Sequence, residues 1–511
     1  MRKLVGSICA LALLAPTPAS FAQQNGGEQG ERRYAPQRDL CRLPTALPRL
    51  GREVEQQQQR PAHRTGGTLS EGRSAEMEST PALMAPPPAP APPPPAAPIA
   101  ARSKATDGDG YASDRAPSEF ASSPIMPESR PEPRPKSRPQ SGLLTAGEHD
   151  DLLNPELYAE YVRNSNVGQY ARNIPALDTG RLLTIEAKDS RGQPMPFVPV
   201  EIRCANGQSI TLQTVADGSS VFFPDLDRLG NRVQVRAGNS PWRSVDLSSG
   251  NGTQTIGFTL KERAANVRKL DLVLVVDVTG SMSDELSFLQ AELSSIVDQI
   301  NRRHRGLDIR VGFTFYRDQG DEFVTRSFAL NPNLNLAKRR IGQQSAMGGG
   351  DYPEAMHTAL IRAANQPWRS DAVKSLLLVA DAPPHDRDIE MTWRAAEHLR
   401  ADRVHIIPVG ASGVADTAEY VMRAMAAATQ SRYTFLTDDS GIGNPHAAPA
   451  IDCYLVTRLD ALLRRVIDSQ ISGRRIEPDR NEIIRSVGKY DAGKCILPSD
   501  FSQKRRNKQG A

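Results

Sequence analysis

The second half of the chain alternates continuous apolar runs with segments whose apolar residues recur every three or four positions. Residues 272–276 form such a run, as expected of a strand that is covered on both faces. Residues 283–305 have the spacing of an amphipathic helix, which ends at Gly306. Similar patterns predict strands at 309–316, 375–380, 404–409 and 433–436, and helices after Pro353 and at 390–401, 418–429 and 455–471. We therefore predict an α/β domain over residues 269–475, with a doubly wound, mainly parallel sheet.

Residues 181–262 have a different pattern, in which short runs often alternate apolar and polar residues and are rich in β-branched side chains. Asn206-Gly207, Asp217-Gly218 and Asn251-Gly252 separate some of these runs, and such pairs tolerate the positive φ of tight hairpins. The predicted strands are 182–187, 198–204, 209–215, 220–223, 232–237, 243–247 and 253–260. This series of short strands predicts a small all-β sandwich.

The residues before the sandwich contain little apolar surface. Ten of the twenty residues 81–100 are proline, which has a fixed φ and no backbone donor. We therefore predict a disordered, Pro-rich tether over residues 23–140. A short helical segment is predicted at 141–180, and residues 476–511 form a C-terminal extension.

The first 22 residues have the three parts of a secretory signal peptide. They begin with the basic Met1-Arg2-Lys3, continue with an apolar run over 4–15 and end in Ser20-Phe21-Ala22. The run is too short to span a bilayer comfortably, although an uncleaved anchor is the alternative. No later stretch approaches about 20 apolar residues, so we expect no transmembrane segment after cleavage. The protein is expected to be exported, either to a periplasm or out of the cell.

Cleavage of the signal peptide leaves four cysteines, Cys41, Cys204, Cys453 and Cys495. An even number in an oxidising compartment permits two disulfides, with three possible connectivities. We favour a bond between Cys453 and Cys495 because both flank the same C-terminal helical segment. That choice leaves Cys41 to pair with Cys204, and four unpaired thiols are the alternative.

The charge balance argues against one class of partner. Lys and Arg number 63 against 59 Asp and Glu, a net charge of +4 over 511 residues. Nucleic-acid binding would need a concentrated basic face with base-stacking aromatic residues, and the sequence has neither pattern.

Side chains with oxygen atoms follow two of the predicted strands. Asp277, Thr279 and Ser281 alternate in the loop after the strand at 272–276, where Gly280 eases a tight turn. Asp381 directly follows the strand at 375–380. Ligands of such sheets sit beyond the carboxyl ends of the strands, so these side chains can face one ion. Oxygen-only ligands favour a hard cation such as Mg²⁺; hydroxyls that merely cap the next helix are the alternative.

Asp277-x-Thr279-x-Ser281 matches the D-x-[ST]-x-S motif of von Willebrand factor A (VWA) domains, and Asp381 matches the strand-end aspartate of the same site. The domain therefore resembles VWA domains, whose metal-ion-dependent adhesion site uses these residues. The resemblance implies a bound Mg²⁺, with Mn²⁺ or Ca²⁺ as alternatives. Three segments are similar to one VWA subgroup, which includes hemicentin and the VWA domains joined to alpha-kinases. These segments are 316–318, 348–355 and 381–385.

Two further resemblances concern the rest of the chain. Residues 189–194, with Thr214 and Asp217-Gly218, resemble carboxypeptidase-regulatory-like sandwiches, which implies a spacer or adhesive module without catalysis. The arrangement over 145–495 is similar to uncharacterised bacterial exported VWA proteins, which share the segments at 145–148 and 435–443.

The second metal loop departs from the VWA pattern. VWA domains usually place a threonine there, whereas residues 346–351 contain none, and Ser345 and Asp351 are the nearby oxygen donors. We predict Asp351 as a further metal ligand, with capping of the helix after Pro353 as the alternative. Arg317, Asp318 and His385 follow strands at the same edge and are predicted to contribute to partner binding. An Arg317–Asp318 ion pair and a structural hydrogen bond of His385 are the alternatives for these three residues.

Three functions fit these features. The VWA resemblance favours a binding module, in which the metal keeps an open coordination position for an acidic side chain of a protein partner. A metal-dependent hydrolase or phosphotransferase is the first alternative, but we find no nucleophile with an adjacent base and no P-loop, so no enzymatic activity is predicted. A structural envelope scaffold is the second alternative, favoured by the long tether and the non-catalytic sandwich.

Overall fold

The structure is a computed structural model that describes residues 40–51, 139–170, 177–248 and 252–497. The predicted signal peptide, most of the predicted tether and residues 498–511 lie outside these ranges. No helix among the described residues is both long and apolar enough to span a bilayer.

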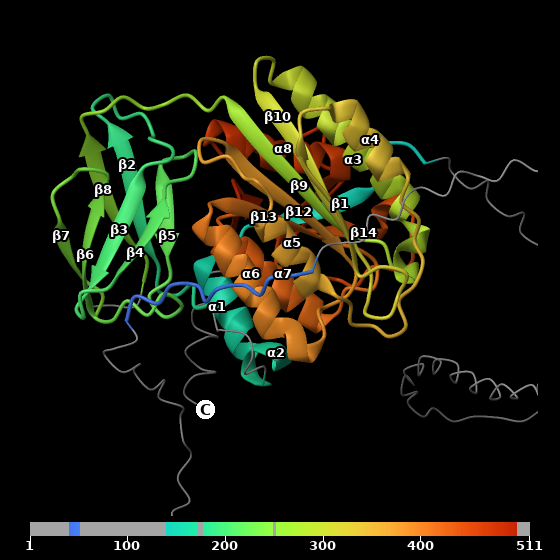
Figure 1. The fold of residues 1–511 in the computed structure, drawn as a ribbon, viewed down its shortest axis with the longest axis horizontal. Helices are drawn as coiled ribbons and strands as arrows, with labels where there is room; N and C mark the ends of the chain where they lie inside the picture. The colour runs from blue at the N-terminus through green and yellow to red at the C-terminus, as the bar shows by residue number, and fades with distance from the viewer. Residues whose placement is uncertain (1–39, 52–138, 171–176, 249–251, 498–511) are drawn as a thin grey trace, which may run out of the picture. The chain divides into compact units, whose positions relative to one another are not determined.

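One large mixed sheet organises the described C-terminal half of the chain (Figure 1). Strands β9, β10, β12, β13 and β14 pair in parallel, and the remaining strands pair antiparallel. In sheet order the strands are β11 (Thr325–Asn331), β10 (Asp308–Tyr316), β9 (Lys269–Asp277), β12 (Val373–Ala380), β13 (Val404–Gly410), β14 (Tyr433–Thr437), β1 (Thr145–His149), β15 (Tyr454–Arg458) and β16 (Arg485–Val487). The parallel strands confirm the predicted α/β domain.

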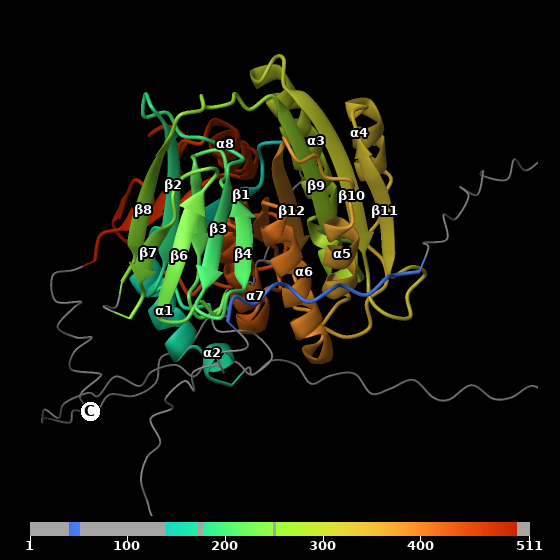
Figure 2. The same cartoon turned by 60° about the vertical axis from the view of Figure 1, so that its left-hand side comes forward.

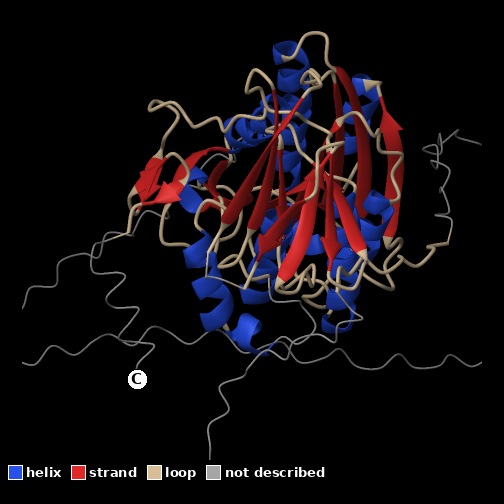
Figure 3. Ribbon diagram, turned by 90° about the vertical axis from the view of Figure 1, so that its left-hand side faces the viewer, coloured by secondary structure: helices blue, strands red, loops and turns tan. Residues whose placement is uncertain are grey.

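Helices cover both faces of this sheet (Figure 3). The apolar run of β9 explains why, because Val273 and Val275 pack into one core while Leu272, Leu274 and Val276 pack into the other. The helices of the first core are α5 (Met356–Ala364), α6 (Ile389–Ala401) and α7 (Asp416–Ala428); those of the second are α3 (Leu286–Arg303), α4 (Leu334–Gly342) and α8 (Leu459–Ser472).

Residues 145–149 form strand β1, so the prediction of a helical segment at this point is wrong. The helices α1 (Pro155–Asn164) and α2 (Asn166–Tyr170) begin only after this strand. β1 lies between β14 and β15 and pairs antiparallel with both. A methyl group on Gly147 would overlap the ring of Phe435, which meets Tyr454 edge to face. Tertiary packing therefore decides the conformation of a segment whose own sequence has little strand preference.

Two other elements differ from the predictions. Residues 454–458 form strand β15 rather than the start of a helix, because they pair with β1 and β16, and α8 begins at Leu459. The edge strand β11 and helix α4 were not predicted. The alternating pattern of β11 is weak, because several of its residues are only partly buried.

Residues 183–260 form the predicted sandwich of two sheets (Figure 2). One sheet has the order β5-β2-β8 and the other β4-β3-β6-β7. Their bounds are β2 (Leu183–Asp189), β3 (Pro199–Cys204), β4 (Ser209–Gln213), β5 (Ser219–Phe222), β6 (Arg232–Ala237), β7 (Arg243–Asp246) and β8 (Gln254–Leu260). Inward-facing side chains such as Ile185, Ile202 and Val235 are fully buried, as expected for alternating strands.

A disulfide joins Cys41 to Cys204 on the sandwich. The backbone of Cys41 also donates a hydrogen bond of 2.9 Å to the carbonyl of Arg228. Residues 40–51 are therefore held in place, although they lie within the region predicted to be a disordered tether.

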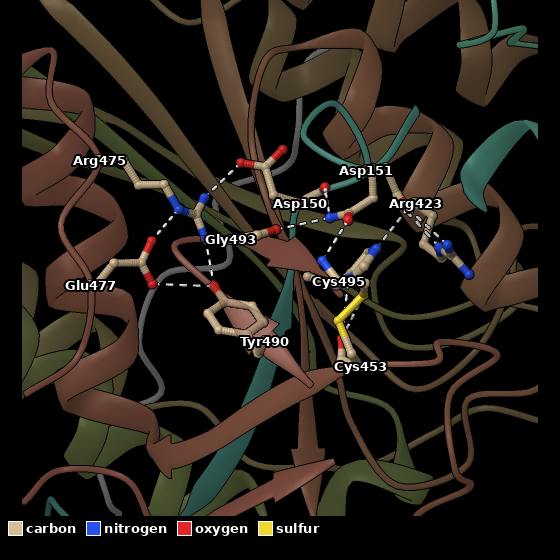
Figure 4. Close-up of a disulfide and its surroundings, with 11 residues drawn as sticks. Asp150, Asp151, Arg423, Cys453, Arg475, Glu477, Tyr490, Gly493 and Cys495 are labelled. Carbon is tan, nitrogen blue, oxygen red and sulfur yellow. Dashed lines mark hydrogen bonds and ion pairs between the residues drawn. A yellow bond between two sulfur atoms is a disulfide. The ribbon is translucent and has the colours of Figure 1, made fainter. Parts of the chain in front are cut away.

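The C-terminal extension is attached at the β1–α1 connection (Figure 4). The disulfide Cys453–Cys495 joins its last hairpin, β17 (Tyr490–Asp491) and β18 (Lys494–Cys495), to the segment before β15. The backbone of Cys495 donates to Asn154 Oδ1 at 2.8 Å, and Arg475 forms an ion pair of 2.7 Å with Asp150. This disulfide is the pairing that we favoured from the sequence.

Candidate metal site

The candidate site lies at the edge where the parallel strands end. Asp277 is the last residue of β9, and Asp381 follows the last residue of the neighbouring strand β12. The loop after β9 turns into a short 3-10 helix, η2 (Gly280–Asp284), before α3 begins. The two carboxylates thus start at the same edge of the sheet, as predicted, and the structure shows that their strands are neighbours.

Three predicted ligands gather in the first loop. Asp277 Oδ1 accepts hydrogen bonds from the backbone nitrogen of Thr279 at 2.9 Å and from its hydroxyl at 2.7 Å. The Thr279 hydroxyl lies 3.1 Å from the Ser281 hydroxyl. Neither η2 nor α3 has a side-chain cap, so the hydroxyls do not serve as helix caps.

The carboxylates of Asp277 and Asp381 are buried, and no ion pair to either is found among the described residues. Within the described part of the chain, Asp277 Oδ2 and Asp381 Oδ1 have no hydrogen-bond partner, although the nearby Tyr316 hydroxyl lowers the pKa of Asp277 slightly. Burial, together with the charge of Asp381, raises the pKa of Asp277 to about 7. Burial also raises the pKa of Asp381 to about 6, although the Ser281 hydroxyl offsets part of the increase. Orphaned carboxylate oxygens beside two hydroxyls are a donor set that fits a hard divalent cation.

The second loop is held against the first. The backbone of Gly280 donates to the Gly348 carbonyl at 2.9 Å, and that of Met347 donates to the Val278 carbonyl at 3.1 Å. Gly348 and Gly349 have φ values of 81° and 75°, a region that glycine adopts without strain.

Asp351 is exposed and lies beside a different pair of side chains. Its carboxylate, that of Asp318 and a ring nitrogen of His385 all lie within 4.8 Å of one another. Asp277, Asp381 and Asp351 do not form such a group among the described residues. Helix α5 begins at Met356, its N-cap position is Ala355, and no side chain caps it, so Asp351 does not cap it either. Its predicted role as a metal ligand stays a prediction.

The residues predicted for partner binding have separate contacts. His385 Nε2 lies 2.7 Å from Asp318 Oδ1, which orients both side chains. Arg317 is buried, stacks on Phe323 at 4.5 Å and reaches Glu322 at 3.4 Å. Arg317 and Asp318 are therefore not paired with each other.

Glu354 is a site residue that the sequence did not single out. It is 3% exposed, and its Oε2 has no hydrogen-bond partner among the residues described. Burial and the nearby Asp277 carboxylate raise its pKa to about 9. An acidic residue just before a helix is ordinarily explained by the helix dipole, so its sequence position gave no separate signal.

The loop after β14 also contacts this edge of the sheet. His446 Nε2 lies 2.7 Å from the buried Glu285, and His446 Nδ1 lies 2.8 Å from Asp438. Burial lowers the pKa of His446, but the hydrogen bonds to Glu285 and Asp438 and the charges of these carboxylates together outweigh it and raise the pKa. The contacts fix residues 438–446 beside the start of α3.

The sequence profile of the von Willebrand factor A domain family matches residues 271–444. Alpha-protein kinase vwkA of Dictyostelium discoideum is 28% identical over 118 residues, which cover 23% of this chain and 19% of that protein. An ariadne-like RING finger protein of Acanthamoeba polyphaga mimivirus is 38% identical over 125 residues, covering 24% and 12% of the two chains. The matched region thus spans less than a fifth of either relative.

Solved structures with a similar arrangement include BatB of Bacteroides thetaiotaomicron, with a TM-score of 0.28 and 11% identity over 39% of this chain and 98% of that one. The pilus adhesin SpaC of Lactobacillus rhamnosus GG has a TM-score of 0.29 and 14% identity over 47% and 31% of the two chains. The family match covers strands β9 to β14, helices α3 to α7 and both strand-end aspartates. Residues 271–444 of this chain are therefore a von Willebrand factor A domain.

Proposed function

We propose that the VWA domain is a metal-dependent module that binds a protein partner. The observation that carries this proposal is the pair of buried carboxylates, Asp277 and Asp381, whose free oxygens have no donor among the described residues. A divalent cation such as Mg²⁺, held by these two residues with Thr279 and Ser281, would offer a coordination position to an acidic side chain of the partner. The exposed Asp351 and the partly exposed His385, which is held by the buried Asp318, would belong to the surrounding contact surface.

We also propose that the protein acts outside the cytoplasm. The two disulfides, Cys41–Cys204 and Cys453–Cys495, support this proposal because disulfides persist in oxidising compartments. The partner would then be an envelope, matrix or secreted protein.

The test compares capture of proteins from the native envelope and secreted fractions in Mg²⁺ and in EDTA. Beads carry the chain without residues 1–22, the Asp277→Ala variant, or Glu390→Gln, which removes an exposed charge on α6. We expect one partner to bind the first and third beads in Mg²⁺ only, and to bind directly once purified. A partner that binds equally in EDTA, while metal still raises the melting temperature, would support the scaffold function instead.

A further inference from the structure

The backbone of Glu354 crosses the end of the strand that carries Asp277. The backbone nitrogen of Glu354 donates to the Pro383 carbonyl at 3.0 Å, in the loop after β12. The next nitrogen, that of Ala355, donates to the Arg317 carbonyl at 3.3 Å, directly after β10. Because β9 lies between β10 and β12 in the sheet, the segment that holds Glu354 passes over the end of β9.

The side chain of Glu354 points towards the first metal loop. A methyl group added to Gly349 would lie 2.9 Å from Glu354 Oε1 and 3.3 Å from Thr279 Cβ. Glu354 Oε1 and the side chain of Thr279 therefore both lie beside Gly349. This places Glu354 next to the loop that carries Asp277, Thr279 and Ser281.

The described surroundings of Glu354 are acidic. After burial, the causes that raise its pKa are the carboxylates of Asp277, Asp318, Asp381 and Asp321, in that order. Across the described ranges, no ion pair to Glu354 is found and its Oε2 has no donor. A buried carboxyl group among other carboxylates is costly unless a cation shares the site or the group stays neutral.

We propose that Glu354 supplies a third carboxylate to the cation site formed by Asp277 and Asp381. This inference rests on the metal site of the proposed function and adds to it a ligand from outside the D-x-T-x-S loop. Each of the three side chains is almost fully buried and has one carboxylate oxygen without a donor among the described residues, an arrangement that suits an oxygen-coordinated divalent cation.

The experiment is a calorimetric titration of Mg²⁺, and separately Mn²⁺, into the full chain without residues 1–22. The variants are Glu354→Gln, which keeps the shape but loses the charge, and Glu390→Gln, the same change at an exposed carboxylate on α6, away from the site. Asp277→Ala serves as the site-loss control. We expect Glu354→Gln to weaken the binding of both ions at least about tenfold, since even residues that only orient a metal ligand have effects of that size. Glu390→Gln should leave the affinity for both ions almost unchanged.

The outcomes separate this inference from the proposed function. If the wild type binds neither ion, both fail. If Asp277→Ala no longer binds the ion while Glu354→Gln binds it as tightly as the wild type, only the role of Glu354 is overturned. Glu354 is then a buried neutral acid. Circular dichroism checks that each variant is folded. Should Glu354→Gln not fold, Glu354→Asp keeps the charge but withdraws the oxygens by one methylene, and wild-type affinity in that variant would also overturn the role.

Discussion

Three carboxyl groups at the edge of the sheet oppose the stability of the domain that contains them. Asp277, Asp381 and Glu354 each bury an oxygen that no donor in the described chain satisfies. An unsatisfied buried polar group costs about 1–3 kcal/mol, and a charged one costs more. Residues that reduce the stability of the fold at the end of a strand are typical of binding sites.

Replacing one of these carboxylates should therefore stabilise the metal-free protein. Asp277→Asn keeps an oxygen that can accept the two hydrogen bonds from Thr279 but removes the repulsion with Asp381. We expect the free energy of unfolding in EDTA to rise by about 1–3 kcal/mol, and the increase in melting temperature on adding Mg²⁺ to disappear. Denaturant unfolding with and without Mg²⁺ measures both effects. A variant that is less stable than the wild type in EDTA would contradict this view of the site.

The same groups predict a pH dependence. The folded pKa values of Asp277, about 7, and Glu354, about 9, lie above the ordinary values of 3.8 and 4.5. Between the ordinary and the folded pKa values these two groups hold more protons in the folded state than in the unfolded state, so their contribution to the stability of the metal-free protein should fall as pH rises from about 4 to about 9. Buried histidines act in the opposite direction, because burial lowers the pKa of His149 and His405. Saturating Mg²⁺ should remove only the contribution of the carboxyl groups, because it replaces their protons. The difference between the melting temperatures in Mg²⁺ and in EDTA should therefore increase across this range; a difference that shrinks as pH rises would be the opposite result.

Part of the site could be predicted from sequence because it is local. Asp277, Thr279 and Ser281 lie within five residues, and Asp381 follows an apolar run that reads as a buried strand. Glu354 could not be predicted, because its place depends on backbone hydrogen bonds of Glu354 and Ala355 to loops about 30 residues later and about 40 residues earlier in the chain. The same is true of Asp351, whose sequence position next to the glycine loop does not determine which carboxylates it faces.

At the scale of elements, strand β1 is the feature that distinguishes this sheet. Its Glu148 is fully buried and forms ion pairs of 2.7 Å with Arg432 and 3.0 Å with Arg465. Burial alone would raise the pKa of Glu148, but the two guanidinium groups outweigh it and lower the pKa to about 2. At the other end of the strand, Glu292 of α3 accepts backbone hydrogen bonds from Gly142 to Leu144. The strand is thus fixed by charge at both of its ends.

Glu148→Gln should destabilise the protein by about 3–5 kcal/mol, since breaking a buried ion pair leaves its partners uncompensated. Glu262→Gln, at an exposed position between the sandwich and β9, should leave the stability almost unchanged. Urea unfolding of both variants at neutral pH tests the difference. Equal midpoints for the two variants would show that β1 is not anchored by this triad.

Elements with strong periodicity were predictable, and those that depend on distant partners were not. The seven strands of the sandwich and the parallel strands β9, β10, β12, β13 and β14 carry their patterns in their own residues. β1 has the sequence Thr-Ala-Gly-Glu-His, which contains no apolar alternation, and it becomes a strand only between β14 and β15.

At the scale of the whole molecule, the large sheet is built from residues on both sides of the sandwich. β1 precedes the sandwich, β9 follows it, and β16 comes from the C-terminal extension. The segment 269–475 that the sequence suggests as a domain therefore lacks β1, together with β16 and Cys495.

A fragment of residues 269–475 should consequently not fold on its own. It would expose the edge of β14 and leave Arg432 and Arg465 buried without Glu148. We expect the fragment to be insoluble or to lack a cooperative melting transition, whereas residues 23–511 should melt cooperatively. Expression of both, followed by circular dichroism, decides the question. A soluble short fragment with a sharp transition would mean that the C-terminal domain is complete without β1.

The position of β1 also constrains when this protein can fold. Thr145 and its partner Thr437 are separated by 292 residues, so β1 leaves the ribosome long before either of its neighbouring strands exists. Contacts of such long range form late, because the intervening chain must first be brought together. The sandwich, whose strands are contiguous, can complete itself early, while the sheet that carries the candidate metal site must wait until almost all of the polypeptide is available to fold.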